Sequence, residues 1–158
     1  MHTSIYAGLC GLLLAFPALQ TIKACRANKV KLGDGGIFVL QSAMRAHGNF
    51  AEYMPITIIM LFLLEFNGAP AWVIHVIGAT FLIGCWIHAQ GLLKDDLPKR
   101  VKGMGVTLTI LIGLSIANIA IVAFKIVKNF NSNLLATILL GSAESPHSRC
   151  SLGDRSPA

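Results

Sequence analysis

Long stretches without a charged side chain constrain this chain more than any other feature of its sequence. Three stretches lack Asp, Glu, Lys and Arg: residues 1–22, 66–93 and 103–124. Each is at least as long as the roughly 18–20 apolar residues that an α-helix needs to cross a bilayer. Only 13% of the residues are charged, which is about half the share found in soluble domains. The sequence therefore predicts an integral membrane protein.

A fourth charge-free stretch, residues 53–64, is too short to cross a membrane alone. It becomes a span if its helix also includes the polar residues that precede it, from about residue 42. We therefore expect four helices, at about 3–23, 42–66, 71–93 and 103–128. Helices are favoured because backbone groups in lipid must form their hydrogen bonds within the segment. The predicted fold class is all-α, a four-helix membrane bundle.

The expected organisation is one membrane domain followed by a polar tail. The length suits a single domain, which we assign to residues 1–130. Residues 131–158 are rich in Ser, Asn, Pro and Gly around one short apolar run. We expect this segment to be a disordered tail without a function of its own.

The positive charge of the chain is unevenly distributed, and this predicts its orientation. Between the first and second spans lie Lys23, Arg26, Lys29 and Lys31, whereas residues 67–71 carry no charge. Lysine and arginine gather again between the third and fourth spans. Because cytoplasmic loops of membrane proteins are enriched in Lys and Arg, the first and third connections are expected in the cytoplasm. Both termini would then lie on the opposite side.

Several kinds of site are not supported by the sequence. The GDGG segment at 33–36 lacks the flanking elements of a phosphate-binding loop and is predicted to be a turn. The four cysteines show no metal-binding spacing, and Cys10 and Cys85 are expected to pack as small apolar residues. Metal binding by His47 and Glu52 would need a third ligand, and none can be named. The basic residues are not interleaved with aromatic ones, so no nucleic-acid partner is expected.

A polar stripe precedes the apolar part of the second span, in the segment SAMRAHGNFAEYMP at 42–55. On a helix, Arg45, Asn49, Glu52 and Tyr53 fall within an arc of roughly 100°. The stripe could be an interfacial belt, in which Arg reaches the headgroups and Tyr anchors the boundary. Glu52, however, lies roughly 10 Å deeper than Arg45. Ionisable groups within spans usually face the interior and mark a functional site.

A second polar cluster is predicted on the same side of the membrane, where the fourth helix begins. Pro98 is a plausible start signal for that helix, which puts Lys99, Arg100 and Lys102 in its first turn. The partial positive charge of the helix N-terminus adds to theirs. Together the two clusters suit an anionic ligand that carries both carboxylates and an amine.

The segment RAHGNFAEYMP resembles the motif of the MAPEG family, the membrane glutathione transferases and eicosanoid-forming synthases. Its Arg-x-x-x-Asn-x-x-Glu-Tyr-x-Pro core is filled completely, and KRVKGM resembles the start of that family's fourth helix. The likeness covers about residues 3–128 and is strongest to small bacterial inner-membrane members.

The resemblance implies a homotrimer of four-helix subunits that binds glutathione, as a co-substrate, at subunit interfaces near the cytosolic face. It assigns Arg100 to the thiolate, with Lys102 as the alternative. It assigns the rest of glutathione to residues of the second helix: Arg45, His47, Asn49, Glu52 and Tyr53.

The implied activity is transfer of the glutathione thiolate to lipophilic electrophiles, or reduction of lipid hydroperoxides by glutathione. A thiol with a pKa of about 8.5 needs roughly 2.7 kcal/mol of selective anion stabilisation to reach a pKa of about 6.5. One arginine and a helix N-terminus could supply it. The chain departs from the eicosanoid-forming members near the end of the third span, where WIHAQGLL contains His88 and no tyrosine. A lone histidine there is more often a hydrogen-bonded packing residue than a catalytic base.

The sequence leaves three other classes of function to compare with this one. A member of the same fold that binds glutathione or a lipid without chemistry is the first, and the missing tyrosine favours it. A small multidrug transporter is the second, but its first span would need an acidic residue and residues 1–22 have none. An inert structural subunit is the third, and Glu52 within a span argues against it.

Overall fold

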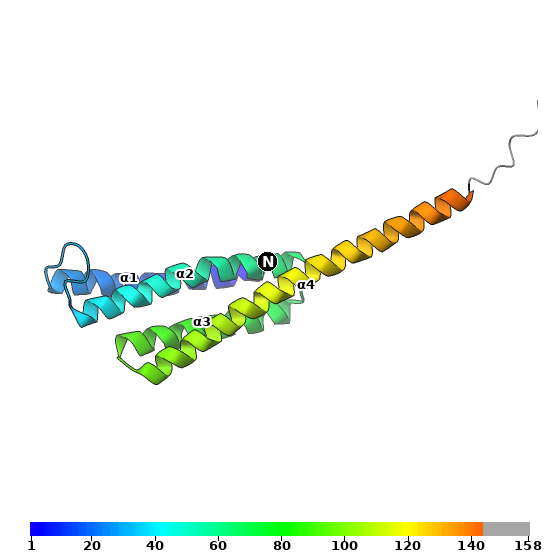
Figure 1. Cartoon of the computed structure of the whole chain (residues 1–158). Coiled ribbons are helices and arrows are strands. Elements are labelled where there is room, and N and C mark those ends of the chain that lie inside the picture. Colours follow the sequence, from blue (N-terminus) through cyan, green and yellow to red (C-terminus); the bar gives the residue numbers. More distant parts are fainter. Residues whose placement is uncertain (144–158) are drawn as a thin grey trace, which may run out of the picture. The chain divides into compact units, whose positions relative to one another are not determined.

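The computed structural model describes residues 1–143 of the chain, and the side chains of residues 1–138. Four α-helices make up this part of the chain. They are α1 (Thr3–Ala27), α2 (Phe38–Phe66), α3 (Ala71–Leu93) and α4 (Leu97–Ala143), shown in Figure 1. Each is long and apolar enough to cross a membrane, and the described residues contain no strand. The predicted all-α class with four membrane helices is confirmed.

Three of the four helices are longer than predicted, whereas α3 has the predicted bounds, 71–93. Helix α1 continues to Ala27 rather than 23, and α2 begins at Phe38 rather than 42. Helix α4 runs from Leu97 to Ala143, where 103–128 was expected. Hydropathy marks the residues that are stable in lipid, whereas a helix continues until its hydrogen-bonding pattern is broken. The predicted ranges therefore mark the parts that cross the membrane, whereas the observed ranges mark whole helices.

The chain divides into two units, Met1–Ile119 and Ala120–Ala158. The first contains α1, α2, α3 and α4 as far as Ile119. In the second, the described part is the remainder of α4, which is helical to Ala143. Residues 131–143, expected to belong to a disordered tail, are therefore helical. The rest of that expected tail, 144–158, lies outside the described residues.

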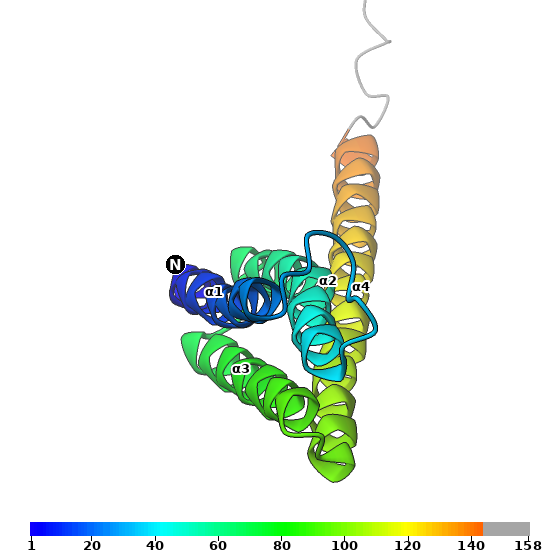
Figure 2. The same cartoon turned by 90° about the vertical axis from the view of Figure 1, so that its left-hand side faces the viewer.

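The core of the first unit lies where α1, α2 and α3 pack together, as the end-on view in Figure 2 shows. It consists of small, aromatic and larger aliphatic side chains from all three helices. Cys10 and Cys85 belong to it, as their predicted packing role requires, and both are free thiols. The buried members of the cluster are Cys10, Ala46, Phe50, Met54, Phe81, Cys85, Ala89 and Leu92.

Helices α3 and α4 approach each other closely through glycine. A Cβ on Gly103 would lie 2.4 Å from the backbone nitrogen of His88 and 2.7 Å from the carbonyl oxygen of Gly84. A Cβ on Gly91 would lie 2.4 Å from the backbone nitrogen of Arg100. Small residues at membrane helix interfaces allow this kind of backbone contact. These contacts fix His88 and Arg100 next to each other.

A short turn joins α3 to α4. Asp95 adopts a left-handed conformation with φ 54°, and the Asp96 N–H donates to the Gly91 carbonyl at 2.8 Å, which satisfies the end of α3. The Asp96 side chain then accepts the Lys99 N–H at 3.1 Å and caps the start of α4. Pro98 follows within the first turn, where proline is tolerated. Asp96 thus ends one helix and begins the next.

The connections at 28–37 and 94–96 lie at the same end of the first unit, and the N-terminus lies at the other end, near residues 67–70 (Figure 1). At that second end, Glu65 of α2 accepts the backbone N–H groups of His2 and Thr3. The two basic connections therefore lie together, as their charge predicted. That this end faces the cytoplasm stays a prediction.

Candidate functional site

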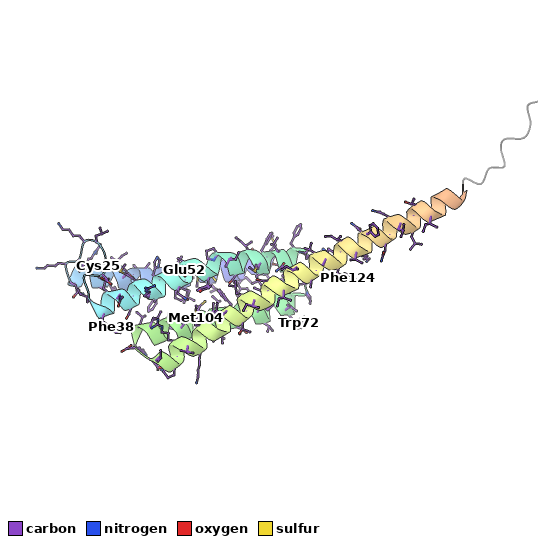
Figure 3. All side chains as sticks on the ribbon, viewed as in Figure 1. Cys25, Phe38, Glu52, Trp72, Met104 and Phe124 are labelled. Atoms are coloured by element: carbon purple, nitrogen blue, oxygen red, sulfur yellow. The ribbon has the colours of Figure 1, made fainter. Side chains whose placement is uncertain are left out.

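A cavity of about 1000 Å³ lies within the first unit, towards the end with the basic connections. Figure 3 marks two of its residues, Glu52 on α2 and Met104 on α4, at a similar level along the helices. The 28–37 connection and α2, α3 and α4 all contribute to its walls. The lining residues are Gly33, Asp34, Gln41, Met44, Arg45, Gly48, Asn49, Glu52, His88, Leu92, Arg100, Val101, Met104, Gly105 and Leu108.

Helix α2 supplies three of the residues predicted from its polar stripe. Arg45, Asn49 and Glu52 are spaced by four and three residues, so one face of the helix presents them together. The Asn49 side-chain amide donates to the sulfur of Met104 on α4 at 3.5 Å. Arg45 and Glu52 are exposed in the single chain and form no ion pair within its described part. Their charged ends are therefore free to meet a ligand.

Helix α4 supplies Arg100, which the sequence placed in its first turn. Arg100 lines this cavity and also a smaller adjoining pocket of about 270 Å³. Arg45 lines both as well, so the two arginines stand at the junction of the two spaces. The polar clusters on α2 and α4 were expected to meet at one depth. Of the α4 cluster, Arg100 shares the cavity with Arg45, Asn49 and Glu52.

Three predicted site residues do not line the cavity in the single chain: His47, Tyr53 and Lys102. His47 is two positions before Asn49, and Lys102 is two positions after Arg100. Two residues correspond to about 200° around a helix, so each points away from its cavity-lining neighbour. The His47 Nδ1 atom is buried and has no hydrogen-bond partner among the described residues.

The sequence reasoning missed Asp34, which lines the cavity from the connection between α1 and α2. Its side chain accepts the Gly36 N–H at 3.0 Å. Gly33 and Gly36 have φ of 74° and 72°, a conformation that glycine adopts without strain. The segment is a turn, as predicted. The position of Asp34 between glycines indicates a turn, but no pattern in the sequence indicates that this turn reaches the cavity.

His88 of α3 is both a packing residue and a lining residue. It is 7% exposed, and its Nδ1 atom lies 2.9 Å from the Arg100 carbonyl oxygen. The sequence favoured the first of these roles. The cavity adds the second, because the ring forms part of the wall beside Arg100.

The charge at the start of α4 is locally balanced outside the cavity. Lys99 lies 2.6 Å from an Asp96 oxygen. The hydrogen bonds from Lys99 hold the pKa of Asp96 below its ordinary value. This pairing occupies Lys99, whereas Arg100 on the next position lines the cavity.

The cavity holds charges of both signs: the guanidinium groups of Arg45 and Arg100, and the carboxylates of Asp34 and Glu52. Such a set suits a zwitterionic ligand, because each charged group on the ligand can find an opposite partner. The described residues contain no group of three possible metal ligands.

The sequence is similar to known membrane proteins. The model of the MAPEG family matches residues 3–120. The chain is 35% identical over 127 residues to the inner membrane protein YecN of Escherichia coli K12, covering 80% of this chain and 97% of that protein. The YecN protein of Escherichia coli O6:H1 matches equally well. With four membrane helices and this match over most of its length, the chain belongs to the MAPEG family of integral membrane proteins.

Proposed function

We propose that this protein is a membrane-bound glutathione transferase that joins the glutathione thiolate to lipophilic electrophiles, or uses it to reduce lipid hydroperoxides. The observation that carries the proposal is the set of charged groups around one cavity: Arg45 and Glu52 from α2, and Arg100 from α4. Glutathione is a tripeptide with two carboxylates, one ammonium group and one thiol. Arg45 can pair with one carboxylate, Glu52 with the ammonium group and Arg100 with the thiolate.

The second helix would hold the peptide. Arg45 would pair with a glutathione carboxylate, with two parallel hydrogen bonds where the geometry allows. Glu52 would accept the γ-glutamyl ammonium, and Asn49 can both donate to and accept from the peptide backbone. Tyr53, His47 and Lys102 would act only if the ligand or a neighbouring copy extends to them, since the single chain keeps them out of the cavity wall.

Arg100 would stabilise the thiolate. The thiol of free glutathione is a weak nucleophile, and an adjacent cation lowers its pKa by favouring the anion. Arg100 lies in the first turn of α4, so the N-terminal end of that helix dipole acts in the same direction. The cavity is at the upper end of the roughly 300–1,000 Å³ usual for ligand sites, which leaves room for an electrophile beside the tripeptide.

We also infer that the protein works as a homotrimer with this end in the cytoplasm. Glu52 is exposed in the single chain although it belongs to a membrane helix, and an ionised group facing lipid is costly. A neighbouring copy that closes the cavity would remove that cost. The molar mass of the protein in detergent, measured by light scattering, tests the trimer. A monomer that binds glutathione with full affinity would contradict it.

The function is tested by titrating the purified full chain with glutathione while following ultraviolet absorbance of the thiolate. We expect the native protein to bind glutathione and to form the thiolate at neutral pH. Arg100→Ala should bind but not ionise the thiol, and Glu52→Gln should bind weakly. A native protein that does not bind glutathione would refute the proposal.

Two control variants make the test specific. Lys102→Ala removes the same charge as Arg100→Ala from the same turn of α4, at a position outside the cavity wall. Glu65→Gln removes a carboxylate from the opposite end of α2. Both should ionise glutathione like the native protein. If Lys102→Ala abolishes the thiolate and Arg100→Ala does not, Lys102 rather than Arg100 stabilises the thiolate.

A binding protein without chemistry is the second candidate. Helix α3 contributes His88 and Leu92 to the cavity, and no tyrosine. Glutathione binding without any thiolate in the native protein would identify this case.

A further inference from the structure

The hydrogen bond between His88 and Arg100 determines where the imidazole carries its proton. The Nδ1 atom of His88 lies 2.9 Å from the Arg100 carbonyl oxygen. A carbonyl oxygen can only accept a hydrogen bond, so Nδ1 must be the protonated nitrogen. In the neutral ring the other nitrogen, Nε2, then carries a lone pair and acts as an acceptor.

That lone pair is available to the cavity. His88 lines the cavity, and no described group forms a hydrogen bond with its Nε2 atom. The ring is only 7% exposed. The Nε2 atom is not fully buried, and the residue that carries it forms part of the cavity wall. A ligand in the cavity that brings a proton to this acceptor can form a hydrogen bond with it.

Close packing of α3 against α4 positions the backbone that carries the ring and the carbonyl that binds it. The backbone of His88 lies against Gly103 of α4, where even a methyl group would clash. The backbone of Arg100, which holds Nδ1, lies equally close to Gly91 of α3. One hydrogen bond thus joins the histidine to the residue proposed to stabilise the thiolate.

We propose that His88 is a catalytic residue: its Nε2 atom accepts the proton of the glutathione thiol. This inference rests on the proposed function and adds a general base to it. The S–H bond breaks, its electron pair stays on sulfur, and the proton forms imidazolium on His88. When the thiolate displaces chloride from a chlorodinitrobenzene, a C–S bond forms and chloride leaves with the C–Cl electron pair. His88 then returns its proton to water.

The charges around the ring favour this route over release of the proton to solvent. Around the cavity stand Asp34 from the 28–37 connection, Arg45 and Glu52 from α2, and Arg100 from α4. These four groups balance one another. Transfer to His88 creates a thiolate and an imidazolium together, so the net charge of the cavity does not change. Release to solvent would leave an added negative charge in a partly dry site, which is less favourable.

The test uses the variant His88→Asn in the full-length protein. The asparagine amide can replace Nδ1–H as donor to the Arg100 carbonyl, but it has no group in the position of Nε2. We expect glutathione binding close to native. Thiolate formation at neutral pH and conjugation to chlorodinitrobenzene should both fall by about 10²-fold or more, the usual contribution of a general base. His75→Asn, on the same helix but outside the cavity, should behave like the native protein.

A second measurement needs no variant. Calorimetric titration of the native protein in buffers with different ionisation enthalpies counts the protons released as glutathione binds. S-methylglutathione, which has no thiol proton, gives the background. If His88 keeps the proton, the native protein forms thiolate with far less than one proton released per thiolate.

The outcomes separate this inference from the proposed function. One proton released per thiolate in the native protein, or native activity in His88→Asn, would overturn the role of His88 and leave the transferase intact. Absence of any thiolate in the native protein would overturn both.

Discussion

Gly103→Ala tests whether the site depends on the close approach of α3 and α4. The added Cβ would lie 2.4 Å from the His88 backbone nitrogen, whereas ordinary contact begins at 3.4 Å. The two helices would therefore have to separate by about 1 Å, because the clashing atoms belong to backbone and cannot rotate away. Overpacking of this kind costs about 1–3 kcal/mol. Thiolate formation should also fall, by less than in His88→Asn, because the 2.9 Å hydrogen bond between His88 and Arg100 lengthens.

The assay is equilibrium unfolding in mixed detergent micelles, followed by circular dichroism, together with the glutathione thiolate signal. Gly113→Ala is the matched control, since a Cβ at Gly113 on the same helix would meet no atom within 4 Å. We expect the control to be as stable as the native protein or slightly more stable, because alanine favours helix more than glycine. If both variants unfold alike and retain the thiolate, α3 and α4 are not in backbone contact at Gly103.

Three further outcomes are expected from contacts outside the cavity. Hydrogen bonds from Lys99 lower the pKa of Asp96 below its ordinary value of 3.8. The cap that Asp96 forms on α4 therefore stabilises the fold above pH 3.8. It weakens as the pH falls through the lower pKa that Asp96 has in the folded protein. Asp96→Asn should keep the cap and remove this part of the acid dependence of unfolding. Asn118→Leu removes a 3.1 Å hydrogen bond to the Met60 carbonyl on α2 and should cost about 0.6–1.7 kcal/mol in micelle unfolding. Glu65→Gln should raise amide hydrogen exchange over the first turn of α1, whose N–H groups it accepts, and leave glutathione binding unchanged.

The helices could be predicted from the sequence because one physical quantity, transfer of side chains into lipid, determines which segments span. Four of the eight helix ends could not, because backbone hydrogen bonds and capping decide where a helix stops. The start of α4 depends on the Asp96 side chain. Its continuation to Ala143 crosses Lys125 and Lys128, where the expected span stopped. Prediction of the spans therefore succeeded, and so did both ends of α3, the start of α1 and the end of α2, whereas the other four helix ends were predicted wrongly.

Within the site, the spacing of Arg45, Asn49 and Glu52 was informative because one helix carries all three. The same rule of about 100° per residue could have excluded His47 from the face that carries Asn49. The place of Asp34 could not be foreseen, since a loop returns to a cavity only through tertiary packing. Their roles in binding glutathione stay predictions.

The turn at Asp96 has a consequence for how the protein assembles in the membrane. His88 and Arg100 are 12 residues apart in the chain, whereas Asn49 and Met104, which join α2 to α4, are 55 apart. Short closures carry a smaller entropic cost and local contacts form early. The α3–α4 hairpin should therefore form first, and refolding in vesicles followed by hydrogen exchange would show it protected before α2. The reactive half of the cavity would then exist as a preformed hairpin, and docking of α2 would add the half that recognises the peptide.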